Sequence, residues 1–215
     1  CRTNHQWLLV LLLTQTLEAI MIEDHHYLYG PGEIPGYISE SDLRSIELLS
    51  KKIKPNGTLV EIGPFLGKSS AEWAKHLPDG KIICIDSFNS PYHVLEQLLI
   101  QADFEVPQGP STHRQLFDYY TQKYKNIFAI EGFFNKTFGY PGKVDFVYED
   151  STQTGEYFEF ALPFWWRRIK SGGILAGHDY YDGIKTAVDL FAVIYNTKIH
   201  TVAEGSTIWY TIKDE

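Results

Sequence analysis

Residues 61–70 read EIGPFLGKSS, and this stretch has the outline of a loop that leads from a strand into a helix. Gly63 and Gly67 enclose only three residues, whereas a phosphate-binding P-loop has four residues between its first glycine and the Gly-Lys-Ser/Thr end. Glu61, two positions before the first glycine, would also repel a triphosphate. The stretch therefore predicts a strand–loop–helix unit that binds a ligand other than a triphosphate, with Lys68 facing solvent in the first turn of the helix.

Short apolar runs alternate with helical patterns around this loop, which indicates βαβ units and an α/β fold with a parallel sheet. The last two apolar runs, joined by Glu204-Gly205, predict a C-terminal hairpin. A helix capped by Ser39 or Ser41 is expected before the first strand. The expected strands are 58–63, 81–86, 126–132, 144–150 and 172–179, followed by the hairpin runs 198–205 and 206–213. The other expected helices are 67–76, 91–102, 111–124, a short piece near Asn135, 155–170 and 182–196.

The composition fits one globular domain that binds a small molecule. The chain has 215 residues, of which 44% are hydrophobic and 21% charged, and we expect residues 37–215 to form a single domain. A net charge of −8 without a basic run argues against a nucleic-acid partner. Cys84 lies in an apolar run and is expected to be a buried thiol. A reducing, cytoplasmic location fits this cysteine usage.

Residues 1–36 are expected to form an N-terminal segment that acts as a helix, a lid or a dimer contact. The apolar run from Trp7 to Leu13 is far too short for a membrane span and has about the length of a signal-peptide core. No small-residue cleavage site follows it closely, so a secretion signal is the weaker alternative. Met21 is a candidate true start, and the apolar segment suggests a homodimer.

Every expected parallel strand ends in a carboxylate, at the sheet edge where open α/β sheets bind their ligands. Such an edge favours a cationic ligand, and S-adenosylmethionine (SAM) carries a sulfonium, an ammonium and a ribose diol. The glycines would let the backbone approach it, and Asp86 would accept hydrogen bonds from the ribose. The helix beginning near Lys68, with Ser69 and Ser70, would receive the carboxylate of the ligand.

Aromatic residues after the second and third strands, Phe88, Phe133 and Phe134, would form an apolar slot for adenine. The candidate cofactor-binding residues are Glu61, Gly63, Gly67, Ser69, Asp86, Ser87, Phe88, Gly132, Phe133 and Asp150.

These residues resemble the class I SAM-dependent methyltransferases, in particular the small-molecule O-methyltransferases of the macrolide-sugar and cephalosporin-biosynthesis type. The matching stretches are IPGYISESDLRSIELL, LVEIGPFLGKSS, ICIDSF, VDFVYEDS and SGGILAGHDYYDGIKTAVDLF, which span roughly residues 34–192. The resemblance implies a Rossmann-like, doubly wound, mostly parallel seven-stranded sheet with helices on both faces and an antiparallel C-terminal hairpin. It also implies methyl transfer to a small-molecule acceptor.

Methyl transfer to an oxygen needs a general base or a metal that lowers the pKa of the acceptor. Asp150 and Asp179 follow neighbouring strands, so their carboxylates should converge, and two carboxylates with water suit Mg²⁺. In metal-dependent relatives the corresponding acids hold such an ion. The resemblance therefore implies Asp150 and Asp179 as metal ligands, with His178 or Tyr180 beside them, and Asp150 and His178 as candidate catalytic residues.

The sequence departs from the family pattern after the fourth strand, where Gln153 replaces a histidine and Thr152 an acidic residue. An amide cannot act as a base near neutral pH. Three alternatives stay open: the metal alone activates the acceptor, His178 acts as the base, or the protein binds SAM as a non-catalytic binding or scaffold protein. A P-loop nucleotide hydrolase is a minor alternative. Asp150 and Asp179 could also be helix caps, and His178 a structural residue.

Overall fold

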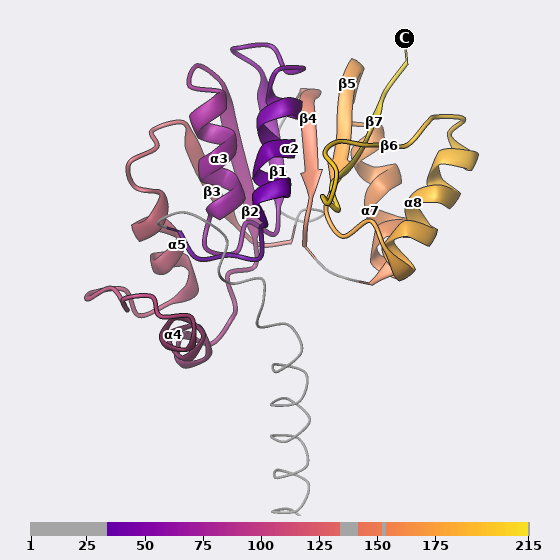
Figure 1. Cartoon of the computed structure of the whole chain (residues 1–215). Helices are drawn as coiled ribbons and strands as arrows, with labels where there is room; N and C mark the ends of the chain where they lie inside the picture. Colours follow the sequence, from indigo (N-terminus) through magenta and orange to yellow (C-terminus); the bar gives the residue numbers. More distant parts are fainter. Residues whose placement is uncertain (1–33, 134–141, 152–153, 215) are drawn as a thin grey trace, which may run out of the picture.

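The computed structural model describes residues 34–133, 142–151 and 154–214. They build one seven-stranded sheet in the order β3-β2-β1-β4-β5-β7-β6, with helices in front of and behind it (Figure 1). Strands β1 to β5 run parallel, and β7 pairs antiparallel with both β5 and β6. The predicted doubly wound, Rossmann-like α/β fold is therefore confirmed.

The boundaries of the elements lie close to the expected ones. The strands are β1 (Thr58–Ile62), β2 (Lys81–Asp86), β3 (Ile127–Glu131), β4 (Val144–Glu149), β5 (Ile169–Gly177), β6 (His200–Thr201) and β7 (Trp209–Ile212). The helices are α2 (Glu40–Ser50), α3 (Lys68–His76), α4 (Tyr92–Gln101), α5 (His113–Thr121), α7 (Gly155–Trp166) and α8 (Asp182–Ile194). The predicted helical piece near Asn135 and the predictions for residues 1–33 fall outside the described residues.

The sheet is buried on both faces, as expected for parallel strands between helices. Successive side chains of a strand point to opposite faces: Val60 and Ile62 join the core with α7 and α8, whereas Leu59 packs with α2 and α3. Cys84 belongs to the second core and is fully buried, which confirms the predicted buried thiol. A third cluster joins Leu66 of the loop after β1 to α4 and α5.

The boundary between α7 and β5 differs from the prediction. A helix was expected to Lys170, but α7 ends at Trp166 and β5 begins at Ile169. Ile169 pairs with Val144 of β4, and the next pair is Ile174 with Phe146. The register of the two strands shifts between these pairs. Pairing with the sheet therefore overrides the helical pattern of this stretch. The C-terminal hairpin is confirmed, although β6 has only two residues.

The strand order reverses between β1 and β4, which lie side by side. Such a switch point opens a crevice at the carboxyl ends of the strands, where open α/β sheets bind ligands. The loop at 63–67 follows β1 and Asp150 follows β4, and the N–H of Asp150 donates to the carbonyl of Ile62 at 2.9 Å. The fold thus places the two main predicted site segments side by side at the switch point.

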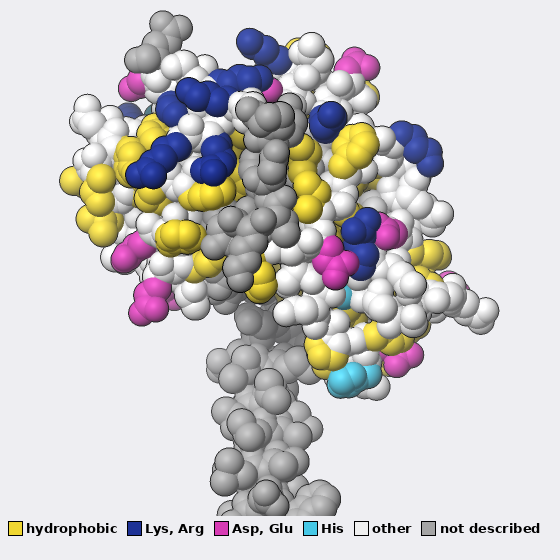
Figure 2. Space-filling view, turned by 180° about the vertical axis from the view of Figure 1, so that it is seen from behind, with side chains coloured by type: hydrophobic (Ala, Val, Ile, Leu, Met, Phe, Trp, Pro, Cys, Tyr) yellow, Lys and Arg dark blue, Asp and Glu magenta, His cyan; other side chains and the backbone are white. Residues whose placement is uncertain are grey.

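Two surface properties bear on the environment of the protein. Within the described part of the chain, no helix combines the length and the apolar character needed to cross a membrane. The face opposite to that of Figure 1 carries several Lys and Arg side chains together in its upper part, with hydrophobic side chains between them (Figure 2). Positive charge is therefore gathered locally although the chain as a whole carries −8.

Candidate functional site

The loop after β1 depends on its two glycines because both have positive φ angles, +77° at Gly63 and +92° at Gly67. A Cβ on Gly63 would fall 2.3 Å from the carbonyl oxygen of Asp150, and one on Gly67 would fall 2.4 Å from Cγ2 of Thr121. The sequence analysis expects the glycines to let the backbone approach a ligand. The structure gives a different reason for the glycines, because the loop packs against the end of β4 and against α5.

Glu61 lies under this loop and is fully buried. The hydroxyl of Ser70 donates to its Oε2, and the thiol of Cys84 lies 3.6 Å from the same oxygen. Its Oε1 is buried and has no hydrogen-bond partner within the described residues. Burial raises the pKa of the carboxyl, against the opposing effect of the Ser69 and Ser70 hydroxyls. Ser69, in the first turn of α3, is buried as well. A buried carboxylate oxygen that lacks a partner fits a ligand with a cationic group such as the ammonium of SAM.

Lys68 is only 6% exposed, so the prediction that it faces solvent is wrong. The physical reason is the segment before α2: a Cβ on Gly36 would fall 2.9 Å from Cβ of Lys68, which places this backbone directly over the lysine. The Nζ atom is buried and no residue of the described ranges hydrogen-bonds to it, and burial lowers the pKa of Lys68 to about 8. An unpaired buried ammonium weakens the folded state.

Asp86 ends β2 and is partly buried. Its Oδ1 accepts hydrogen bonds from the N–H of Phe88 at 2.9 Å and from the hydroxyl of Ser87 at 3.4 Å. The N–H of Gly132, after β3, donates to the carbonyl of Asp86 at 2.7 Å. These contacts fix the carboxylate at the sheet edge beside the loop, where it was expected to receive the ribose.

The predicted adenine slot is only partly present in the structure. Phe88 has a φ of +45°, and its ring is buried against His113 and Phe117 of α5. It therefore belongs to the core beneath the crevice and not to an open slot. Phe133 is 59% exposed, and Phe134 falls outside the described residues.

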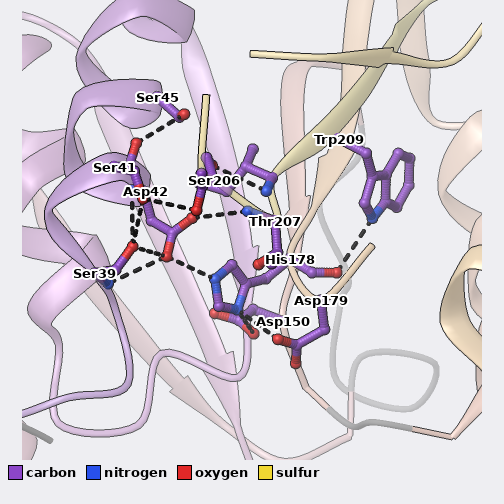
Figure 3. A network of polar contacts seen from close by, with 12 residues as sticks. Ser39, Ser41, Asp42, Ser45, Asp150, His178, Asp179, Ser206, Thr207 and Trp209 are labelled. Carbon is purple, nitrogen blue, oxygen red and sulfur yellow. Dashed lines mark hydrogen bonds and ion pairs between the residues drawn. The ribbon is translucent and has the colours of Figure 1, made fainter. Parts of the chain in front are cut away.

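The structure brings three predicted residues together at the carboxyl ends of β4 and β5 (Figure 3). Nδ1 of His178 lies 3.0 Å from Oδ1 of Asp179 and 3.6 Å from Oδ1 of Asp150. One ligand atom from each residue lies within 4.8 Å of the other two. Neither acid caps the following helix, because Thr154 caps α7 and Tyr181 caps α8.

Tyr180 was expected near this cluster, but it points elsewhere. Its hydroxyl donates to Asp189 of α8, and its N–H donates to the carbonyl of Thr207 at 3.0 Å. Thr152 and Gln153, whose identity departs from the family pattern, lie outside the described residues.

A fourth residue, Asp42 of α2, completes the cluster and was missed by the sequence analysis. Its Oδ2 lies 3.2 Å from Nε2 of His178, on the opposite side of the ring from Asp150 and Asp179 (Figure 3). The only local signal was the helix start Ser39-Glu-Ser-Asp42, which forms a capping box. Such a pattern predicts a helix cap and does not reveal a contact with a residue far along the chain.

The charges of this cluster are strongly coupled. Burial opposes the charged form of His178, but the carboxylates of Asp150, Asp179 and Asp42 raise its pKa to about 11. Burial raises the pKa of Asp150 well above its usual range. Burial acts in the same direction on Asp42, but His178 lowers the pKa of Asp42 to about 2. Three carboxyl groups thus face one imidazole, and this excess of acid fits a bound divalent cation.

A family model described as a methyltransferase domain matches residues 60–180. This range holds the loop after β1, the carboxylate at the end of β2 and the cluster at the ends of β4 and β5. No curated protein matches the chain in sequence.

Solved structures similar to the chain belong to methyltransferases with different acceptors. Precorrin-6y C5,15-methyltransferase from Geobacter metallireducens matches with a TM-score of 0.57 and 14% identity, over 88% of this chain and 94% of that chain. The O-methyltransferase TomG from Streptomyces achromogenes, in complex with SAM, matches with a TM-score of 0.53 and 15% identity, over 84% of each chain. An rRNA methylase from Streptococcus thermophilus matches with a TM-score of 0.54 and 13% identity, over 84% of this chain and 100% of that chain. At these identities the likeness shows the fold.

Proposed function

The chain belongs to the methyltransferase family whose domain covers residues 60–180, and it is a SAM-dependent methyltransferase of class I. From this premise we propose that it methylates a hydroxyl oxygen of a small molecule with the help of a divalent cation. The observation that carries this proposal is the convergence of Asp150, His178 and Asp179 at the switch point, next to the glycine loop. A cofactor loop and a cluster that can hold a cation therefore share one crevice.

The cofactor half of the proposal rests on the loop and the end of β2. The orphaned Oε1 of Glu61 fits the ammonium, and Asp86 fits the ribose diol. The N-terminus of α3 with Ser69 fits the carboxylate, because its first N–H groups lack helical partners. Gly132 and Phe133 would border the adenine. SAM supplies a methyl group that is activated by the positive charge of its sulfur.

The acceptor half rests on the acidic cluster. The acceptor oxygen forms a bond to the methyl carbon while the carbon–sulfur bond breaks, which leaves S-adenosylhomocysteine, and the hydroxyl proton passes to solvent water. A divalent cation, when bound, would lower the pKa of that hydroxyl. Asp150 and Asp179 offer the oxygen ligands that Mg²⁺ and Mn²⁺ prefer, and His178 adds a nitrogen ligand. Asp150 adjoins both the glycine loop and His178, which supports a role for it at the reacting centre.

His178 cannot take up the acceptor proton in the cation-free protein. With a pKa of about 11 it already carries a proton on each ring nitrogen at neutral pH. It serves as a ligand only after its Nδ1 has released a proton, and a cation between Nδ1 and the two carboxylates would bring this about. With Nδ1 bound to a cation and Nε2 protonated, His178 would not act as the base.

A small-molecule acceptor is favoured by the net charge of −8 and the absence of a basic run. The local group of Lys and Arg side chains (Figure 2) could contact the phosphates of RNA. RNA is therefore the acceptor to test alongside small molecules. Membership of a methyltransferase family leaves no support for the nucleotide-hydrolase alternative, whereas the non-catalytic scaffold alternative predicts SAM binding without transfer. The cytoplasmic location and the homodimer stay predictions.

The proposal is tested in two steps with the full chain. Calorimetry should detect binding of SAM and of S-adenosylhomocysteine. A transfer assay with methyl-labelled SAM should then be run on phenols, catechols, sugars, hydroxy acids and RNA, with Mg²⁺ and with EDTA. We expect transfer to a hydroxyl compound that EDTA abolishes. Transfer to RNA alone, or SAM binding with no transfer to any acceptor, would contradict the small-molecule proposal.

A further inference from the structure

Asp42 reaches the acidic cluster from α2, an element outside the residues that the methyltransferase family model matches. It is only 4% exposed. We propose that Asp42 is a positioning residue that holds the ring of His178 so that Nδ1 faces Asp150 and Asp179. This inference rests on the proposed function, because the orientation matters only if the cluster holds a cation.

The geometry assigns different partners to the two nitrogens of His178. Nε2 lies 3.2 Å from Asp42, whereas Nδ1 lies 3.0 Å from Asp179 and 3.6 Å from Asp150. A carboxylate beside one imidazole nitrogen keeps the proton on that nitrogen and leaves the other free to bind a metal. Asp42 is an ion-pair partner of Nε2 at 3.2 Å without the alignment of a hydrogen bond. Its charge favours the proton on Nε2 and thus Nδ1 as the ligand atom, on the side where the two carboxylates lie.

Asp42 is itself held rigidly, as a positioning residue must be. Its Oδ1 accepts hydrogen bonds from the hydroxyl of Ser206 at 2.7 Å and from the N–H of Thr207 at 3.2 Å, both in the connection between β6 and β7. Its Oδ2 accepts from the N–H of Ser39 at 3.1 Å and from the Ser39 hydroxyl. Two segments far apart in sequence thus fix the carboxylate that faces His178 (Figure 3).

The main chain of His178 is anchored independently of Asp42. Its N–H donates to the carbonyl of Glu149 at 3.2 Å, and its carbonyl accepts from Nε1 of Trp209 at 3.3 Å. These bonds fix where the residue sits but leave the ring free to turn about its side-chain torsions. The ring is oriented by Asp42 on the side of Nε2 and by Asp179 and Asp150 on the side of Nδ1.

A purely structural role for Asp42 is the competing explanation, because it caps α2 and ties the helix to the hairpin connection. Two variants separate the roles. Asp42→Asn keeps the bonds to Ser206 and Thr207, but it puts an NH2 group where Oδ2 faces Nε2 and accepts from Ser39. Ser206→Ala removes one anchoring bond to Oδ1 and leaves the carboxylate beside His178. A structural role predicts that each variant lowers Mn²⁺ affinity only in proportion to its loss of unfolding free energy, whereas positioning predicts a loss of Mn²⁺ affinity in Asp42→Asn beyond that.

The test measures Mn²⁺ affinity by calorimetry for the wild type and both variants, with SAM affinity measured on the same samples. We expect Asp42→Asn to weaken Mn²⁺ binding about 10- to 100-fold, as loss of a partner behind a ligand histidine does. Ser206→Ala should change Mn²⁺ affinity far less, and SAM affinity should persist in both. Asp42→Glu should recover part of the loss. Equal Mn²⁺ affinity in the wild type and Asp42→Asn would overturn the inference and leave the proposed function intact.

A measurement on the unmodified chain covers the case in which Asp42 variants fail to fold. Nitrogen NMR of the full chain loaded with Mg²⁺ should show His178 protonated on Nε2 and unprotonated on Nδ1. The opposite tautomer would overturn the inference. If the wild type binds SAM but neither Mn²⁺ nor Mg²⁺, the cation part of the proposed function fails and the inference fails with it.

Discussion

Gly63 lies directly against Asp150, so that the glycine loop after β1 and the acidic cluster touch through the backbone. A Cβ on Gly63 would fall 2.3 Å from the carbonyl oxygen of Asp150 and 2.5 Å from the Cα of Ser151. Since real Cβ atoms do not approach backbone so closely, any side chain at this position must push the loop away from the end of β4.

Gly63→Ala should therefore weaken SAM binding and destabilise the fold together. The positive φ alone costs on the order of 1 kcal/mol for a residue with a side chain, and the clash adds to this. Gly109→Ala is the matched control, because Gly109 has a φ of +108° and open space around its Cβ position. Calorimetry with SAM and urea unfolding should show a loss of binding in Gly63→Ala only. Equal unfolding free energies for the two variants would contradict the packing argument.

Asp86→Asn should lower the affinity for SAM and S-adenosylhomocysteine by about 10- to 100-fold. Hydrogen bonds to a charged acceptor contribute roughly 1.5–3 kcal/mol, and the amide cannot accept from both ribose hydroxyls with two equivalent oxygens. Asp118→Asn, at an exposed ion pair with Arg114 on α5, serves as the control and should bind normally. Unchanged affinity in Asp86→Asn would place the ribose elsewhere.

Cation affinity should rise with pH. His178, with a pKa of about 11, must release a proton before Nδ1 can bind a metal, so cation binding and protonation compete. Asp150, whose pKa burial raises well above its usual range, adds to the same competition. For each proton released, Mn²⁺ affinity should increase about tenfold per pH unit at neutral pH, which calorimetry at pH 6.5, 7.5 and 8.5 can measure. His178→Gln should bind more weakly and lose the part of this dependence that His178 contributes. A wild-type affinity that is flat with pH would exclude His178 as a ligand.

Much of the site could be predicted from the sequence because it lies at strand ends. Apolar runs between helical patterns locate the strands, and the parallel topology brings Asp150 and Asp179 to one edge without any knowledge of side-chain contacts. The contact between Asp42 and His178 could not be predicted in this way. It depends on how α2 and the connection between β6 and β7 pack over the sheet, and tertiary packing of this kind leaves no periodic signal in the sequence.

The mistaken predictions have the same origin. A lysine in the first turn of a helix is usually solvated, and nothing in the sequence shows that the backbone at Gly36 lies on top of Lys68. Phe88 follows a strand and was expected at the ligand, but its positive φ and the position of α5 place the ring in the core. Local patterns thus located the crevice, whereas the segments that cover it came only from the structure.

Lys68→Met should stabilise the cofactor-free protein at neutral pH. Burial lowers the pKa of Lys68 from its usual 10.5 to about 8, so between these pH values the unfolded chain binds more protons and the stability of the wild type rises with pH. The variant lacks this contribution, and its advantage, on the order of 2 kcal/mol below pH 8, should shrink toward pH 10. Urea unfolding at pH 7 and pH 10 measures the difference. Lys75→Met, at an exposed position of the same helix, should show no such advantage, and an equal gain from both variants would mean that the Lys68 ammonium reaches solvent.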